Sequence, residues 1–286
     1  MTPIRPLLAL VGGAIAIGFA PIFVRWSEVG LNATAFWRLA LALPALGLLA
    51  RRNAEPLLPA RDHGLLALAG LCFALDLCLW HASIALTSVA NATLLANLTP
   101  IFVVLFYWLV WRRRPTLRFS VGVLLALSGA AGLALGSGSR PSIAGGNVVL
   151  GDLYGVTTAV AYAGYLLAVE RARTTTSGLQ VTLASTAVAM LITGGVALFF
   201  GENFWPATGT GWAVLAGLAL LVHVLGQGGI IWALGQLPAA LSSVVILIQP
   251  VVAAGLGWLL LGEGLGALDA VSAGLVLGGV LICRRQ

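Results

Sequence analysis

The chain has 286 residues, of which 60% are apolar and only 8% are charged, and its mean hydropathy is +1.03. Soluble domains carry about 25% charged residues, so this composition excludes a water-soluble enzyme. All 15 basic side chains are arginines, and the absence of lysine excludes P-loop and Schiff-base chemistry. The composition predicts an integral membrane protein.

Ten apolar stretches are long enough to cross a membrane as helices, which takes about 20 residues each. Turns that contain glycine, proline or arginine separate many of them. In chain order the stretches are residues 4–24, 31–50, 64–86, 89–111, 118–136, 151–172, 179–201, 211–235, 239–261 and 267–283. The pattern predicts an all-α integral membrane protein with ten transmembrane helices.

The distribution of arginine predicts the orientation in the membrane. The formal net charge is +6, and cytoplasmic loops of membrane proteins are enriched in basic residues. With the N-terminus inside, twelve arginines fall on the cytoplasmic side and only Arg25 and Arg140 on the outer side, while Arg38 lies within a span. Both termini are therefore expected in the cytoplasm. Topology accounts for the basic residues, and we expect no nucleic-acid partner.

An internal repeat divides the chain into two halves. A shift of 150 residues aligns 80–132 with 230–282 without a gap, and Pro100 then meets Pro250. Each half contains five predicted helices, an odd number, so the two halves must have opposite orientations, as in many secondary transporters. The expected organisation is a first repeat at 1–136, an extracytoplasmic linker at 137–150 and an inverted second repeat at 151–286.

The chain resembles the EamA-type exporters of the drug/metabolite transporter superfamily. The resemblance lies in the ten-helix layout and in two segments, ALTSVANATLLANLTP at 85–100 and GQLPAALSSVVILIQP at 235–250. Within that family the sequence looks most similar to the YddG-type exporters of aromatic amino acids. The resemblance implies a secondary transporter in the inner membrane of a bacterium, and the direction of transport rests on the resemblance alone.

Asp76 is the only acidic residue well inside a predicted span. A charged side chain at membrane depth usually faces a cavity or a partner. One interpretation makes Asp76 a proton-coupling or amine-contacting group. The other pairs it structurally with Arg38, because the two residues differ in depth by only about 5 Å at 1.5 Å per residue.

Several uncharged polar residues at membrane depth are candidates for substrate contacts. His223 and Gln227 are four residues apart and share one helical face, and Gly226 beside them permits a close approach by a helix or a ligand. Trp80, His81 and Asn97 lie in the third and fourth spans. For each of these side chains, hydrogen bonding between helices is the alternative to lining a cavity.

Pro100 and Pro250 occupy equivalent positions in the middle of their spans. Each removes one hydrogen bond to the carbonyl four residues earlier, at Ala96 and Ile246, and so kinks its helix. Their equivalence favours gating hinges over plain structural kinks. Thr99 and Gln249 precede the two prolines and are candidates either to supply the missing hydrogen bonds or to contact a substrate.

A shift of 143 residues aligns Phe19 with Tyr162, which makes the two rings candidate walls on opposite sides of a central cavity. An apolar, aromatic cavity suits an amphipathic solute with a small polar head. Packing between helices is the alternative role for both rings. The spacings Gly132-x3-Gly136, Gly151-x3-Gly155 and Gly274-x3-Gly278 indicate close helix packing.

Three classes of function remain to be compared. An intramembrane enzyme is disfavoured because no His-Glu-x-x-His, Gly-x-Ser-x-Gly or paired-aspartate motif is present. A channel is disfavoured because no filter-like repeat is visible. We expect an exporter that needs no metal, cofactor or ATPase subunit and works downhill in the lipid bilayer. Its favoured substrates are aromatic and other neutral amino acids, with nucleosides or drug-like compounds as the alternative.

Overall fold

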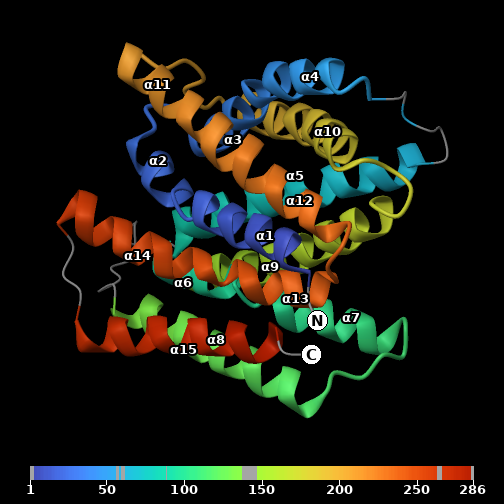
Figure 1. Ribbon diagram of the computed structural model, residues 1–286. Coiled ribbons are helices and arrows are strands. Elements are labelled where there is room, and N and C mark those ends of the chain that lie inside the picture. Colours follow the sequence, from blue (N-terminus) through green and yellow to red (C-terminus); the bar gives the residue numbers. More distant parts are fainter. Residues whose placement is uncertain are drawn as a thin grey trace.

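A computed structural model describes residues 3–55, 58, 62–87, 89–136, 147–262 and 266–284. Within these residues every regular element is a helix. The helices lie side by side with many of their axes along a common direction (Figure 1). Ten helical segments are long and apolar enough to cross a membrane, which confirms the ten predicted spans.

The first five spans contain eight helices, because three of the spans are broken. The helices are α1 (Ile4–Ile17), α2 (Ala20–Trp26), α3 (Leu31–Ala40), α4 (Ala42–Arg52), α5 (His63–Leu86), α6 (Val89–Ala96), α7 (Thr99–Leu109) and α8 (Leu117–Gly136). A proline follows each break, at Pro21, Pro44 and Pro100. Proline has no N–H to donate, so it is tolerated near the start of a helix and interrupts a continuous one.

The second five spans share the break of the fourth span but differ in the sixth and seventh, which are continuous, and in the eighth. They comprise α9 (Val148–Ala172), α10 (Gly178–Phe199), α11 (Gly209–Gly217), η2 (Leu218–Gln227), α12 (Gly228–Leu234), α13 (Ala239–Ile246), α14 (Ile248–Leu261) and α15 (Ala267–Arg284). The eighth span contains η2, a π-helical stretch of ten residues. π-Helical turns are rare and often occur at functional sites.

Helix boundaries confirm the repeat. Adding 150 to the bounds of α6 gives those of α13, and adding 150 to the first residue of α8 gives the first residue of α15. Five spans fall in each repeat, so the two repeats cross a membrane in opposite directions. Residues 137–146, most of the predicted linker, lie outside the described residues, as do Arg61, Arg140 and Arg285.

The contact between α8 and α15 shows the symmetry at atomic level. A Cβ atom added at Gly279 would lie 2.5 Å from the carbonyl oxygen of Gly122, and one added at Gly129 would meet the carbonyl oxygen of Ser272. The shift of 150 residues converts one of these contacts into the other. Such an exchange of equivalent contacts is the property of a two-fold axis.

The predicted small-residue motifs that begin at Gly151 and at Gly274 differ in what they do. Gly151 and Gly155 pack as expected, because added Cβ atoms would lie 2.9 Å from Leu86 and 2.8 Å from Leu95. The prediction was wrong for Gly274 and Gly278, where an added Cβ atom would meet nothing within 4 Å. α15 packs against α8 through a different face, which carries Gly279.

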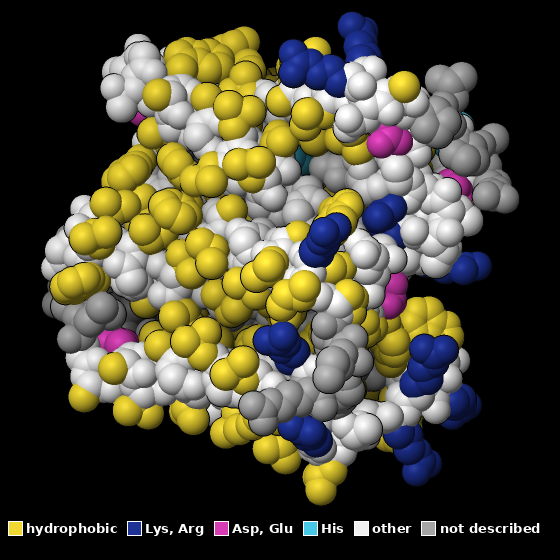
Figure 2. Space-filling model, viewed as in Figure 1, with side chains coloured by type: hydrophobic (Ala, Val, Ile, Leu, Met, Phe, Trp, Pro, Cys, Tyr) yellow, Lys and Arg dark blue, Asp and Glu magenta, His cyan; other side chains and the backbone are white. Residues whose placement is uncertain are grey.

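Arginines gather at one end of the molecule, on the right in Figure 2. Arg51 and Arg52 end α4, Arg113 and Arg114 follow α7, and Arg284 ends α15. We call this side the arginine-rich end. Both ends of the described chain reach it, since Pro3 and Arg284 line one pocket there.

Candidate functional site

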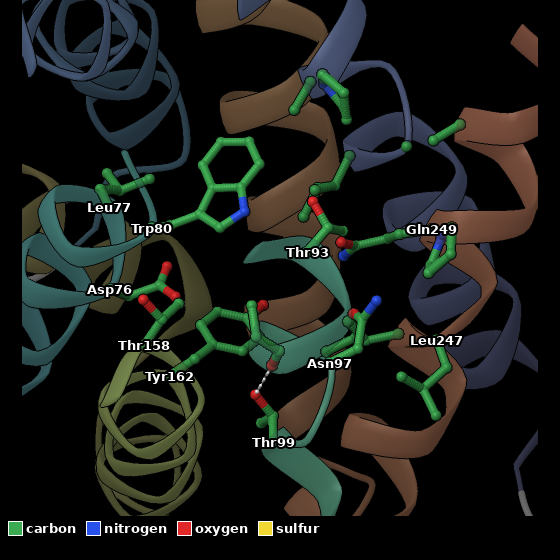
Figure 3. A pocket seen from close by; sticks show the side chains of 18 of the residues that line it. Asp76, Leu77, Trp80, Thr93, Asn97, Thr99, Thr158, Tyr162, Leu247 and Gln249 are labelled. Carbon is green, nitrogen blue, oxygen red and sulfur yellow. Dashed lines mark hydrogen bonds between the residues drawn. The ribbon is translucent and has the colours of Figure 1, made fainter. Parts of the chain in front are cut away.

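A central cavity lies between the two repeats. It contains about 890 Å3 of space not filled by protein atoms, part of it open to solvent, and residues of α1, α2, α3, α5, α6, α7, α9, η2, α13 and α14 line it. Figure 3 shows Asp76, Trp80 and Tyr162 on one side of the cavity, with Asn97 and Gln249 on the other.

Nine of the twelve residues that the sequence proposes for the site line this cavity. They are Arg38, Asp76, Trp80, Asn97, Pro100, Tyr162, Gln227, Gln249 and Pro250. They come from both repeats, as expected for transporters whose substrate site lies at the repeat interface. The structure therefore brings most of the predicted site into one place.

Arg38 and Asp76 both line the cavity, but they do not form the direct ion pair that the sequence offered as one interpretation. Neither side chain takes part in an ion pair of 4.0 Å or less in the described part of the chain. The Arg38 guanidinium carbon instead lies 5.8 Å from the centre of the Phe73 ring. Similar depth along two helices does not fix the direction in which the side chains point, so the two charges face a shared space.

Polar atoms without partners surround this space. The Arg38 side chain is 7% exposed and its Nε atom has no hydrogen-bond partner, and the Thr158 hydroxyl, in a side chain 1% exposed, has none either. Both residues line the cavity. An unsatisfied buried polar atom is unfavourable by about 1–3 kcal/mol, so these atoms are suited to meet a polar ligand.

Aromatic rings form a wall next to the charges. Tyr162, Trp80 and Phe73 line the cavity, and Tyr165 stacks behind them with ring centres 4.9 Å from Phe73 and 5.7 Å from Tyr162. The Tyr165 hydroxyl accepts a hydrogen bond of 3.1 Å from Gln227. This bond fixes the Gln227 amide beside the cavity, in the π-helical stretch.

Thr99 has the structural role that the sequence offered for it. Its hydroxyl donates a 2.8 Å hydrogen bond to the carbonyl of Ala96, the group that Pro100 leaves without its helical donor (Figure 3). The chain is interrupted between α6 and α7 at this point, and again at Leu247 just before Pro250. Gln249, which precedes Pro250, lines the cavity, and so does Thr99.

Three predicted residues lie outside the lining. His223 shares a 2.7 Å hydrogen bond with the Thr186 hydroxyl and stacks on Phe73. His81 is buried, and its ring lies 5.3 Å from that of Trp80. Phe19 sits between α1 and α2 and packs against the hydrophobic core. Gly226 makes the predicted close approach, since an added Cβ would lie 2.8 Å from Ile17 of α1.

Sequence reasoning missed several lining residues. Thr158 lies four residues before Tyr162 on α9, and Phe73 lies three residues before Asp76 on α5, so helical spacing was a usable signal for both. Gly18 and Pro21 also line the cavity, at the break between α1 and α2. No group of three or more His, Cys, Asp or Glu residues that could hold a metal ion is present in the described part of the chain.

At the arginine-rich end a carboxylate contact joins three spans. The Tyr107 hydroxyl lies 2.6 Å from both carboxylate oxygens of Glu170, and the Ala239 backbone N–H donates to the same carboxylate at 3.1 Å. Ala239 is the first residue of α13, whose N–H groups lack helical partners. Glu170 therefore connects the ends of the fourth, sixth and ninth spans.

Two glutamates join the repeats at the opposite end. Glu28, before α3, accepts hydrogen bonds from the Thr208 hydroxyl and from the N–H groups of Ala207 and Thr208 just before α11. Glu202, before α11, accepts from the Asn32 amide at 2.7 Å and from the Ala33 N–H at 2.8 Å in α3. Glu202 thus caps α3, and Glu28 binds the chain just before α11, so each glutamate contacts the other repeat.

The hydrogen bonds to Glu28 also affect its ionisation. The Thr208 hydroxyl, assisted by the backbone N–H groups of Thr208 and Ala207, holds the pKa of the Glu28 carboxyl below its usual value. Hydrogen bonds to the charged form favour that form. The contact is therefore made by a carboxylate at neutral pH.

Comparison with known proteins agrees with this architecture. The EamA-like transporter family matches residues 4–135 and 149–285. A solved structure titled "Crystal structure of protein" superposes with a TM-score of 0.82 at 17% identity, covering 98% of each chain, and supports the fold. No curated protein matches the sequence. Because both halves match its model, the chain belongs to the EamA-like transporter family, within the drug/metabolite transporter superfamily.

Proposed function

We propose that this transporter exports small zwitterionic metabolites, foremost aromatic and other neutral amino acids, by alternating access through the central cavity. The observation that carries the proposal is the placement of Arg38 and Asp76 on one cavity without a direct ion pair. A buried charge at membrane depth needs a partner. A free amino acid supplies one for each, a carboxylate for the guanidinium and an ammonium for the carboxylate.

The chemistry of the two side chains supports this assignment. A guanidinium presents a planar set of donors that matches a carboxylate, whereas a carboxylate accepts hydrogen bonds from an ammonium. The Thr158 hydroxyl, which is buried and without a partner, is a third polar contact for the same headgroup. Nucleosides carry neither charge and leave Arg38 and Asp76 unpaired.

The aromatic wall supports a substrate with an apolar body. Trp80, Tyr162 and Phe73 line the cavity next to the charged residues. Offset or edge-to-face contacts between aromatic rings contribute about 0.5–1.5 kcal/mol beyond the area that they bury. Phenylalanine, tyrosine and tryptophan are therefore expected to bind more tightly than threonine.

The repeat supports alternating access. Inverted repeats allow the two halves to exchange conformations around a fixed site. Pro100 and Pro250 lie at equivalent breaks that adjoin the cavity, and we assign them the role of hinges. We assign to the Tyr107–Glu170 contact the role of a gate that closes the arginine-rich end.

The arginine-rich end is assigned to the cytoplasm, following the positive-inside rule. Both termini then lie in the cytoplasm, and the membrane is the inner membrane of a bacterium. Asp76 lines the same cavity as Arg38 and is assigned a role in binding, so no proton carrier is required. We therefore assign downhill export.

Uptake into liposomes that contain the purified protein tests the proposal. Labelled phenylalanine, threonine and a nucleoside are compared, with and without a pH gradient, against empty liposomes. Saturable uptake of phenylalanine without a gradient is the expected result. Transport of the nucleoside without any amino acid would overturn the substrate assignment, and amino-acid uptake only with a gradient would overturn downhill export.

A further inference from the structure

A second pocket lies at the arginine-rich end, among the ends of α7, α8, α13 and α15. It contains about 1070 Å3 of space not filled by protein atoms, part of it open to solvent. Val104, Phe119 and Leu241 contribute apolar wall, and Arg113 and Arg114 add two positive charges. Such a combination suits an amphipathic anion. Transport through the central cavity does not require this second pocket.

The arginines are held at the pocket by the fold of the turn after α7. The backbone N–H of Arg113 donates a 3.0 Å hydrogen bond to the carbonyl of Tyr107. Arg112, just before it, has a positive φ of 54°, which turns the chain back on the helix. Arg284, from the end of α15, lines the same pocket. Three like charges in one pocket repel one another, and a bound anion would offset that repulsion.

Tryptophans indicate the depth of the pocket in the membrane. Trp108 and Trp111 are 45% and 42% exposed at this end of α7. The Trp111 ring lies 4.7 Å from the ring of Tyr107, which lines the pocket. Exposed tryptophans favour the boundary between headgroups and acyl chains. The pocket is thus placed where a lipid phosphate and the start of its chains would reach it.

We propose that this pocket binds the headgroup of an anionic phospholipid. The phosphate is placed at Arg113 and Arg114, because guanidinium groups bind phosphate through paired hydrogen bonds. The part of the acyl chains nearest the headgroup is placed against Val104, Phe119 and Leu241. Basic pockets between transmembrane helices on the cytoplasmic side are suited to anionic headgroups.

The Glu170 carboxylate near this pocket is engaged by other groups. Glu170 accepts hydrogen bonds from the Tyr107 hydroxyl and from the first N–H of α13. A lipid in the pocket would lie against the Tyr107 ring, which lines it. The site is independent of the transported substrate, so its test needs no transport measurement.

Native mass spectrometry of the protein in detergent tests the proposal, with phosphatidylglycerol and phosphatidylcholine as probes. We expect phosphatidylglycerol to bind and to raise the melting temperature, while phosphatidylcholine does neither. Combined R113Q and R114Q substitutions should weaken phosphatidylglycerol binding by roughly thirtyfold, and each single substitution by roughly fivefold. The matched control combines R51Q and R52Q, which remove two exposed arginines at the same end but outside the pocket.

Two results would overturn the proposal. One is equal loss of phosphatidylglycerol binding in the pocket variant and in the control, which would indicate a general attraction to the arginine-rich end. The other is an equal rise in melting temperature with inorganic phosphate, which would make the site an anion site without a lipid. The single variants keep the test valid if the double variant fails to fold.

Discussion

Tyr107 and Glu170 join the fourth and sixth spans through a hydroxyl that lies 2.6 Å from both carboxylate oxygens. The same carboxylate accepts the first N–H of α13, in the ninth span. The fourth and ninth spans are equivalent in the two repeats, and both are broken beside the cavity. One side chain therefore holds the two broken spans together at the arginine-rich end.

Replacing Tyr107 with phenylalanine should open this end more often. A hydrogen bond to a charged group contributes about 1.5–3 kcal/mol, so the open population should rise about tenfold or more. The native cysteines are removed and a single cysteine is placed at Ser243, which lines the cavity. The measurement is the rate at which a thiol reagent, applied from the arginine-rich side, labels this cysteine. Tyr154→Phe, on α9, is the matched control. An unchanged rate in Tyr107→Phe would contradict the gate.

The two proline breaks should be needed for turnover. Proline inside a continuous helix is unfavourable by about 3 kcal/mol. In a P100A/P250A protein the restored N–H groups can donate within the helix, so the two broken spans should become straighter. Phenylalanine transport should fall roughly tenfold or more, while phenylalanine binding changes little. Pro44→Ala, in α4 and away from the cavity, serves as the control. Normal transport by P100A/P250A would make the breaks purely structural.

Glu28 should stabilise the protein in a pH-dependent way. Its pKa is lowered in the folded state, so its contribution is fully present above its unfolded pKa and is lost as the pH falls through the lower folded value. Glu28→Gln should therefore lower the melting temperature at pH 7, and the difference from wild type should shrink as the solution is acidified. In a Thr208→Val background the effect of Glu28→Gln should be smaller. A difference that is constant with pH would contradict this assignment.

The α8–α15 contact allows a test with adjacent glycines. Gly279→Ala places a methyl group 2.5 Å from a backbone oxygen of Gly122, whereas Gly278→Ala meets nothing within 4 Å. Overpacking typically destabilises by about 1–3 kcal/mol, so Gly279→Ala should lower the melting temperature and Gly278→Ala should not. Equal effects of the two substitutions would contradict the described packing.

Much of the fold follows from the sequence, because the membrane restricts the possible structures. A span needs a run of apolar residues, which can be recognised in the sequence. The equivalent prolines Pro100 and Pro250 show how the two repeats align. The ten spans, the repeat and the hydrogen bond of Thr99 are all confirmed. These features depend on order along the chain, which the sequence gives directly.

Features that depend on rotation about a helix axis could not be predicted in the same way. The depths of Arg38 and Asp76 are similar, yet only the structure shows that both line one cavity without forming a direct ion pair. The break after Ile17 turns Phe19 towards the core, and the choice of Gly279 over Gly278 for packing depends on how α15 is rotated. A glycine-rich pattern allows close packing on several faces and does not select one.

Binding of phenylalanine and two analogues tests the central claim most directly. Phenethylamine lacks the carboxylate and phenylpropionate lacks the ammonium, so both should bind wild type roughly tenfold or more weakly than phenylalanine. Arg38→Gln should weaken the binding of phenylalanine but not that of phenethylamine. Asp76→Asn should weaken the binding of phenylalanine but not that of phenylpropionate. Arg171→Gln is the control. Equal loss of all three ligands in both variants, or equal affinity of wild type for all three, would contradict the recognition of a zwitterion by these two residues.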